Sequence, residues 1–138
     1  MKSLETLLKL AQRRMDDLGV EAARCVMGVE ASRVRHAALR GQAEIEARLA
    51  ADDPGLAPLM PAYLERVKTQ AAALLKAIAS DEANLQALRA QIALAYQEKS
   101  KLAELLEQQS ARDSKRRLDL EQALLDEAAI VGASRYRA

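Results

Sequence analysis

The segment Ala51-Asp52-Asp53-Pro54-Gly55-Leu56-Ala57-Pro58-Leu59-Met60-Pro61 decides the fold of this chain of 138 residues. It holds all three prolines of the sequence and one of its five glycines. Proline lacks the backbone donor that a helix interior needs and clashes with the preceding turn, whereas the first turn of a helix accepts it. We therefore expect one helix over about residues 3–51, a turn over about 52–60 and a second helix over about 61–131.

The residues on either side of this turn favour helix. The chain has 29 Ala and 22 Leu, 30% of its residues are charged, and it has three Tyr but no Phe or Trp. Such a composition is typical of long, exposed helices. It argues against a β-rich fold, a Rossmann-type enzyme and an RNA-binding domain built on aromatic side chains. We predict a single domain over residues 1–138.

Both predicted helices carry apolar residues at alternating spacings of four and three, which is the spacing of a coiled-coil seam. We expect Ser3 to cap the first helix, whose seam drifts to a second series near residues 25–31. The seam of the second helix contains Asp81 and Lys99 and slips by one residue after Leu106. The first-helix series are Leu4, Leu8, Ala11, Met15, Leu18, Ala22, Cys25 and Val29, then Met27, Ala31, Val34, Ala38, Gly41, Ile45 and Leu49. The second-helix series is Leu64, Val67, Ala71, Leu74, Ile78, Asp81, Leu85, Leu88, Ile92, Ala95, Lys99, Leu102 and Leu106, continued by Ser110, Asp113, Arg117, Leu120, Leu124 and Val131.

A short turn makes the two helices antiparallel neighbours. Folding back near residue 56 places residue i opposite about residue 112 − i, so that Leu4 faces Gln108. Residues beyond about 110 then have no partner in the chain, although they include Leu118, Leu120, Leu124, Leu125, Ile130 and Val131. An exposed apolar stripe of this size indicates a partner surface. The predicted fold is all-α: a long two-helix antiparallel coiled coil, or helical hairpin, with a C-terminal helix overhang.

The sequence carries no constellation of residues for catalysis or metal binding. A catalytic or zinc site needs several titrating groups or ligands at one point, and the chain has one His, His36, and one Cys, Cys25. We expect His36 in solvent or at the edge of the seam, and Cys25 as a small packing residue. Phosphate-binding glycine loops, signal peptides and membrane spans are not recognisable. We predict a non-enzymatic protein without a metal or cofactor.

Basic and acidic residues are interleaved, and the formal net charge is +1. No field of a single sign is present to attract nucleic acid or an anionic membrane, and we expect a soluble, cytoplasmic protein. The run Arg112-Asp113-Ser114-Lys115-Arg116-Arg117 lacks the long zipper that follows the basic region of a basic-zipper protein. It is either solvated helix surface or a contact for an acidic protein, and the same two interpretations apply to Arg13 and Arg14.

Two stretches of the sequence resemble the FliJ family of the bacterial flagellar type III export apparatus. Leu4-Glu5-Thr6-Leu7-Leu8-Lys9-Leu10-Ala11-Gln12-Arg13-Arg14 is similar to the start of these proteins, and Glu121-Gln122-Ala123-Leu124-Leu125-Asp126-Glu127-Ala128 is similar to an element near their end. The length, the turn and the longer second helix also fit. One departure concerns aromatic residues, which many members carry along the hairpin and which are here only Tyr63, Tyr96 and Tyr136.

The resemblance implies a stalk that inserts into the hexameric flagellar export ATPase and promotes its assembly and activity. It also implies contacts with the export gate membrane protein and with export chaperones, at the cytoplasmic face of the inner membrane. By this analogy the ATPase contact comprises Leu4, Leu7, Leu8, Arg13, Arg14, Leu120, Leu124, Leu125, Asp126 and Glu127. A weaker candidate for a second partner surface is the tip, with Leu56, Leu59, Met60 and Tyr63.

Two alternatives remain open. The protein is an export chaperone that binds secreted flagellar subunits, or it is a structural coiled coil that self-associates through residues 110–131.

Overall fold

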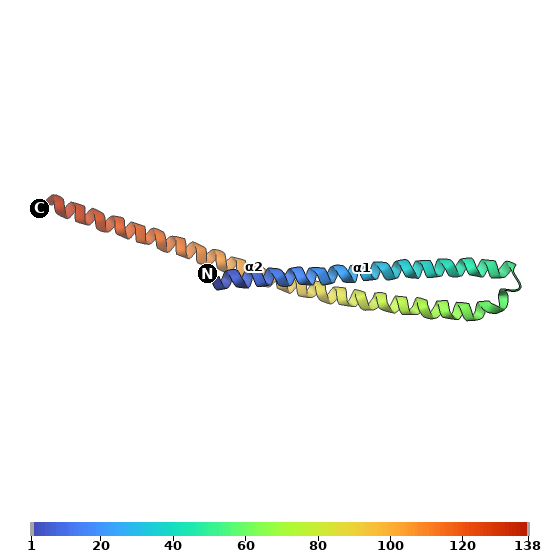
Figure 1. Ribbon diagram of the computed structural model, residues 1–138. Coiled ribbons are helices and arrows are strands. Elements are labelled where there is room, and N and C mark those ends of the chain that lie inside the picture. The colour runs from blue at the N-terminus through green and yellow to red at the C-terminus, as the bar shows by residue number, and fades with distance from the viewer. Residues whose placement is uncertain (1, 138) are drawn as a thin grey trace. The chain divides into compact units, whose positions relative to one another are not determined.

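The computed structural model describes residues 2–137, and these residues form a helical hairpin (Figure 1). The elements are helix α1 (Lys2–Asp52), the short 3-10 helix η1 (Ala57–Leu59) and helix α2 (Met60–Arg137). The two long helices pack against each other, and the described residues include no strand. The predicted all-α hairpin is therefore confirmed.

Asp53 closes the turn between the helices. Its side-chain Oδ1 accepts a hydrogen bond of 2.9 Å from the backbone N–H of Gly55, and its carbonyl oxygen accepts one of 3.1 Å from the N–H of Leu56. Asp and Pro, here Asp53 and Pro54, are favoured at the first two positions of a type I turn. Gly55 does not need a positive φ; instead, a Cβ at this residue would lie 3.2 Å from Asp53 Oδ1.

The helix ends differ from the sequence-based prediction by one residue at Lys2, Asp52 and Met60, and by more at the C-terminal end of α2. Helix α1 begins at Lys2, so Ser3 lies inside the helix, and its predicted role as the N-cap is wrong. In this first turn the Thr6 hydroxyl donates a hydrogen bond of 2.8 Å to the Lys2 carbonyl oxygen. Helix α2 begins at Met60 and extends to Arg137 instead of about residue 131, because Gly132 costs only about 1 kcal/mol of helix propensity.

The contacts of the chain divide it into two compact units, and both long helices contribute to each. One unit comprises residues 15–94, which include the turn, η1 and the helical segments on either side of it. The other comprises residues 1–14 and 95–138, in which the first turns of α1 pack on a C-terminal part of α2.

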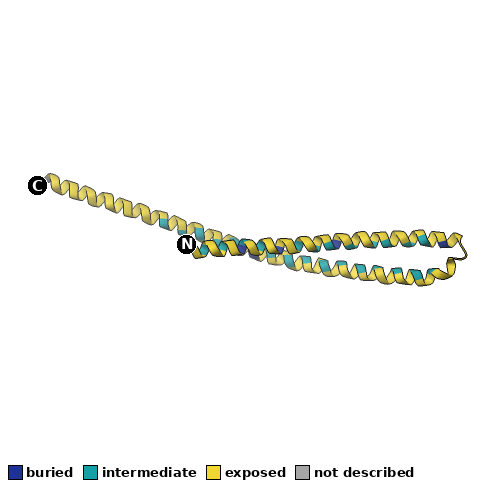
Figure 2. Cartoon of the chain, in the orientation of Figure 1, coloured by how far each residue is buried: buried dark blue, intermediate teal, exposed yellow. Residues whose placement is uncertain are grey.

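The least exposed residues of α1 recur at spacings of three and four (Figure 2). Up to Val29 they include every member of the predicted seam: Leu4, Leu8, Ala11, Met15, Leu18, Ala22, Cys25 and Val29. Ala11, Leu18 and Val29 are buried, and the others are half-buried. This part of the prediction is confirmed.

Beyond Val29 the predicted drift of the seam is wrong. The original spacing continues through Ser32, His36, Leu39, Ala43, Glu46 and Ala50. Residues of the predicted second series face away from α2, and Met27 and Val34 are 72% and 60% exposed. A continuous helix keeps one heptad face toward its neighbour, and α1 packs on α2 on both sides of this stretch. Helix α1 therefore cannot rotate within this stretch so that its more apolar face meets α2.

The seam of α2 follows the prediction from Val67 to Leu106. Ala95, at 3% exposure, is its most tightly packed member, and the polar seam residues Asp81 and Lys99 are half-buried. Near the turn the contact passes through Met60 and Tyr63 instead of Leu64, which is exposed. After Leu106 the contact continues through Gln109 and Asp113, so the predicted slip to Ser110 is wrong.

Candidate partner-binding surfaces

Leu4 faces α2 at the register that the turn predicts. It lines a hollow of about 290 Å³ together with Leu105, Gln108 and Gln109. Arg112, Asp113 and Arg116 line the same hollow. The predicted facing of Leu4 and Gln108 is therefore confirmed, and part of the basic run borders this contact.

The N-terminal residues of the predicted ATPase contact differ in accessibility. Leu4 and Leu8 are half-buried in the seam. Leu7, Arg13 and Arg14 are exposed, and Leu7 retains 48% of its accessible surface. A partner can therefore reach Leu7, Arg13 and Arg14. Leu4 and Leu8 already contribute to the packing of α1 on α2.

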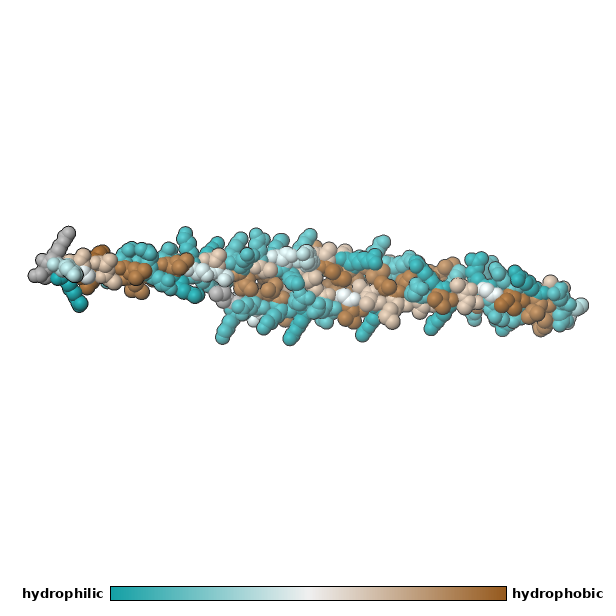
Figure 3. All heavy atoms as spheres, turned by 90° about the horizontal axis from the view of Figure 1, so that it is seen from above, coloured by the Kyte–Doolittle hydropathy of each residue, from teal (hydrophilic) through white to brown (hydrophobic). Residues whose placement is uncertain are grey.

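The C-terminal part of α2 is a helix without a covered face. Each residue from Ser114 to Tyr136 is exposed, and we call this segment the arm. Leu120, Leu124 and Leu125 are 65–66% exposed. In the space-filling view, apolar side chains of the arm lie open on the surface at the left end (Figure 3). The sequence-based expectation that this segment carries uncovered leucines agrees with its accessibility.

The apolar residues of the arm lie in two rows. Leu118 and Leu125 form one row, seven residues apart, while Leu120, Leu124 and Val131 form the other. At 3.6 residues per turn the two rows lie on different faces of the helix. A helix with apolar residues on more than one face is suited to being surrounded by a partner, because packing along one side leaves the other row uncovered.

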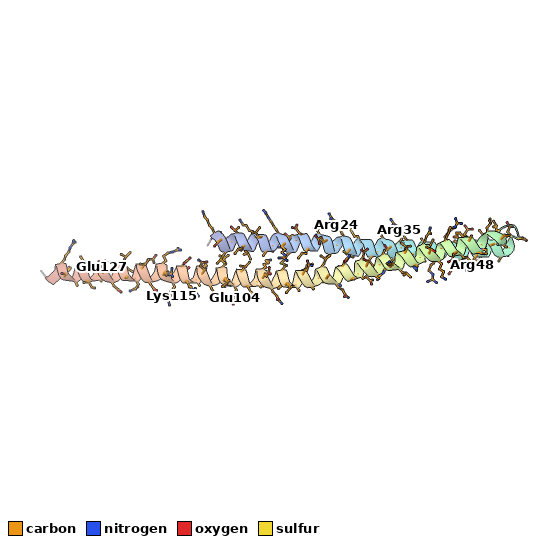
Figure 4. All side chains as sticks on the ribbon, turned by 90° about the horizontal axis from the view of Figure 1, so that it is seen from below. Arg24, Arg35, Arg48, Glu104, Lys115 and Glu127 are labelled. Carbon is orange, nitrogen blue, oxygen red and sulfur yellow. The ribbon has the colours of Figure 1, made fainter. Side chains whose placement is uncertain are left out.

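The two acidic residues of the predicted contact have different surroundings. Asp126 Oδ1 accepts a hydrogen bond of 3.1 Å from the Gln122 side chain one turn earlier, and Glu127 is exposed (Figure 4). Neighbouring residues on a helix point about 100° apart and do not converge. Between residues 2 and 137, no group of His, Cys, Asp and Glu side chains gathers to hold a metal ion.

The structure does not bring the two leucine sets of the predicted contact together. Leu4 faces the stretch between Leu105 and Arg116, and the first leucine of the arm, Leu118, comes later in the chain. A partner that used both sets would therefore extend from the first turns of α1 along the arm. Both sets belong to the unit of residues 1–14 and 95–138.

The four residues predicted at the tip share one hollow of about 350 Å³. Leu56, Leu59, Met60 and Tyr63 all line it, and Leu59 is 65% exposed. The same hollow is also lined by Glu46 and Arg66, which the predicted tip surface does not include. The register of about 112 − i pairs these two residues and would have identified them.

A cross-helix ion pair in the hairpin was also missed. The Arg33 guanidinium donates a hydrogen bond of 2.6 Å to Glu82 Oε1. Cys25 is a half-buried free thiol in the seam, and His36 is half-buried and lines a shallow hollow with Val67. The position of Cys25 agrees with its predicted role as a packing residue. His36 instead belongs to the seam itself, because the original spacing of contact residues continues through it.

Comparison of the chain with protein-family models, with curated proteins and with solved structures finds no match. Within the described helices, no stretch is long and apolar enough to cross a membrane. The arrangement thus defines a helical hairpin in which the predicted partner surfaces include the open arm and the hollow at the tip.

Proposed function

We propose that this protein is a non-enzymatic stalk of the bacterial flagellar type III export apparatus, which binds the hexameric export ATPase and promotes its assembly and activity. The observation that carries the proposal is the arm, in which every residue from Ser114 to Tyr136 is exposed and large apolar side chains lie in two rows. The resemblance of residues 4–14 and 121–128 to the FliJ family supplies the identity of the partner.

A ring of subunits is a suitable partner for such an arm. Its central opening presents protein surface around the whole circumference of an inserted helix, so both apolar rows are covered at once. Removing exposed apolar surface from water contributes about 25 cal/mol per Å², and six large apolar residues of the arm are available: Leu118, Leu120, Leu124, Leu125, Ile130 and Val131. The exposed Arg13 and Arg14 add cationic contacts beside the first turns of α1.

The tip is a second surface in this proposal. Its hollow is lined by Leu56, Leu59 and Tyr63 and is bordered by Glu46 and Arg66, which have opposite charges. The resemblance implies the export gate protein and the export chaperones as further partners, and we assign one of them to the tip in this proposal. Through them the protein would be held at the cytoplasmic face of the inner membrane.

The test is a pull-down with the purified flagellar export ATPase, together with its ATP hydrolysis rate. The wild-type chain is expected to bind and to raise the rate, whereas a variant with Leu120→Asp and Leu124→Asp is expected to do neither. The matched control is Leu75→Asp with Leu94→Asp, because these leucines are 53% and 61% exposed but lie outside the arm. Circular dichroism verifies that all variants stay helical. Absence of wild-type binding contradicts the proposal.

The alternatives give different results in the same experiment. An export chaperone binds a secreted flagellar subunit, does not bind the ATPase and does not change its rate of ATP hydrolysis. A coiled coil that self-associates through the arm forms a dimer that Leu120→Asp with Leu124→Asp dissociates. Cross-linking of the purified chain at low concentration, with and without these substitutions, distinguishes self-association from ATPase binding.

A further inference from the structure

Between residues 27 and 49 the more apolar face of α1 is the one that points away from α2. We call this face the outer stripe. Its members are Met27, Ala31, Val34, Ala38, Gly41 and Ile45, with Leu49 at one edge, and every one of them is exposed. Met27, Val34 and Ile45 retain 72%, 60% and 52% of their accessible surface.

The face of α1 that does contact α2 over the same stretch is less apolar. It includes Ser32, His36 and Glu46. The two faces are offset by two residues, for example Ser32 and Val34, so they lie on nearly opposite sides of the helix. Helix α1 therefore has two packing faces here, and α2 covers only one of them.

The outer stripe has the spacing and the shape of a second coiled-coil seam. Its residues alternate at four and three from Met27 to Ile45. The side chains at the centre of the stripe are small, namely those of Ala31, Ala38 and Gly41. No heavy atom lies within 4 Å of a Cβ built on Gly41. A facing helix could therefore approach closely along the whole stripe.

We propose that the outer stripe binds a second copy of this chain, so that two α1 helices form a parallel, in-register coiled coil. Glu30 and Arg35 flank the stripe on opposite edges, and both are exposed. In a parallel pair, a residue of one edge meets the residue five positions later on the facing chain. Glu30 of each copy thus meets Arg35 of the other, which gives two symmetric ion pairs.

The charges also select the orientation of the two copies. An antiparallel pair places like edges together. One edge carries Glu30, Ala37 and Glu44, and the other carries Arg35 and Gln42. When the same edge of two copies meets in an antiparallel pair, no shift of one copy along the other brings opposite charges together. Between Met27 and Ile45 the edges of the parallel pair bring no like charges together, since Ala37 meets Gln42.

Arginines define both ends of this interface. Arg24 and Arg48 continue the stripe spacing on either side, at three residues before Met27 and three after Ile45, and both are seen on α1 in Figure 4. Like charges at these positions would repel in a parallel pair. The contact is thus confined to about three heptads with several small residues, and we expect a weak dimer that dissociates on dilution.

The first test is the mass of the full chain over a range of concentrations, by sedimentation equilibrium. The wild type should approach twice its monomer mass of 15.1 kDa as concentration rises, whereas Val34→Glu with Ile45→Glu should remain monomeric. Leu75→Glu with Leu94→Glu is the matched control, since these exposed leucines lie on α2, and it should dimerise like the wild type. A wild-type chain that stays monomeric at every concentration overturns the proposal.

The arm is the competing site of self-association. Leu120→Asp with Leu124→Asp should leave the dimer unchanged if the outer stripe is the interface. Loss of the dimer in this variant, together with its retention in Val34→Glu with Ile45→Glu, overturns the proposal in favour of the arm.

The second test concerns orientation. Glu30→Arg alone and Arg35→Glu alone each convert two attractive contacts into repulsive ones, and each should weaken dimerisation about tenfold. An equimolar mixture of the two variants restores opposite charges at both contacts and should dimerise at least as well as the wild type. A mixture that associates no better than the separate variants excludes the parallel, in-register pair. Circular dichroism verifies that both variants remain helical.

Discussion

Gly28 of α1 lies directly against the carboxylate of Asp81 in α2, and a Cβ on Gly28 would stand 3.0 Å from Asp81 Oδ2. Both residues are half-buried. The missing side chain of Gly28 makes room for a polar residue in a seam that is otherwise mostly apolar. The next residue along α2, Glu82, forms the ion pair with Arg33, so a close approach of the helices and an ion pair between them involve neighbouring residues of α2.

Replacing Gly19 and Gly28 by alanine should change the stability of the protein differently, because the space around the two glycines differs. Gly19→Ala should raise the free energy of unfolding by about 0.5–1 kcal/mol, because Ala has the higher helix propensity and nothing lies within 4 Å of a Cβ at Gly19. Gly28→Ala should give a smaller gain or a loss, since its Cβ presses on Asp81. Urea denaturation followed by circular dichroism measures both. Adding Asp81→Ala to Gly28→Ala should recover the gain, and equal stabilisation by the two single variants would contradict this account.

The ion pair between Arg33 and Glu82 should contribute little to stability. Their side chains are 58% and 47% exposed, so water screens the attraction. A double-mutant cycle with Arg33→Ala and Glu82→Ala should give a coupling energy of about 0.2–1 kcal/mol. The coupling should shrink as salt is added, because exposed charges are screened within about 10 Å at moderate ionic strength. A coupling that is insensitive to salt would rule out this description of an exposed pair.

Ala95 defines a tight point of the packing in the unit of residues 1–14 and 95–138. At 3% exposure its neighbours cover it almost completely, so a larger side chain must displace them, and Ala95→Leu should lower the free energy of unfolding by about 1–3 kcal/mol. The control is Ala103→Leu, at an exposed position of the same unit, which should change stability by less than about 0.5 kcal/mol. Urea unfolding compares the two, and similar results for both would show that Ala95 is not closely packed.

The arm should open locally far more often than the paired part of α2. Both belong to one continuous helix, but residues 114–136 are exposed throughout, whereas the stretch from Val67 to Leu106 contributes to the seam. Amide hydrogen exchange of the free chain should therefore be at least about tenfold faster in the arm. Uniform protection along α2 in the free chain would contradict this expectation. Protection of the arm on addition of the export ATPase would support the proposed binding surface.

The Asp53 side chain should stabilise the turn. Asp53→Ala removes the hydrogen bond from the Gly55 N–H and should lower the free energy of unfolding by about 0.5–1.5 kcal/mol. Asp53→Asn keeps a side-chain oxygen in place and is expected to lose less. Urea unfolding of the two variants provides the comparison, and an unchanged stability in Asp53→Ala would show that the backbone alone holds the turn.

The hairpin and most of its seam follow from local sequence. The three prolines mark the turn, and the spacing of leucines, valines and alanines identifies the contact residues of α1 up to Val29 and of α2 from Val67 to Leu106. The register also follows, because a short turn fixes which residues face each other. Leu4 near Gln108 is an example.

Two features that were predicted wrongly or missed depend on the pairing of the helices and not on local sequence. Between residues 27 and 49, α1 has two faces with seam spacing, and hydrophobicity alone selects the more apolar one. The structure selects the other, because the geometry of the hairpin on both sides of the stretch determines which face meets α2. The ion pair of Arg33 and Glu82 was missed for a related reason. It depends on whether two long side chains can meet across the seam, and the spacing of apolar residues does not give that information.

The short turn also governs the order in which the hairpin of residues 15–94 assembles. Glu46 and Arg66 border one hollow beside the turn, whereas Arg33 and Glu82 are 49 residues apart in the chain. The entropy lost on closing a loop grows with the number of residues that it encloses, so contacts beside the turn form at the lowest cost, and each one shortens the loop that the next must close. We therefore expect folding of this unit to proceed from the tip outward, and transient opening to begin at the end of the unit that is farthest from Pro54.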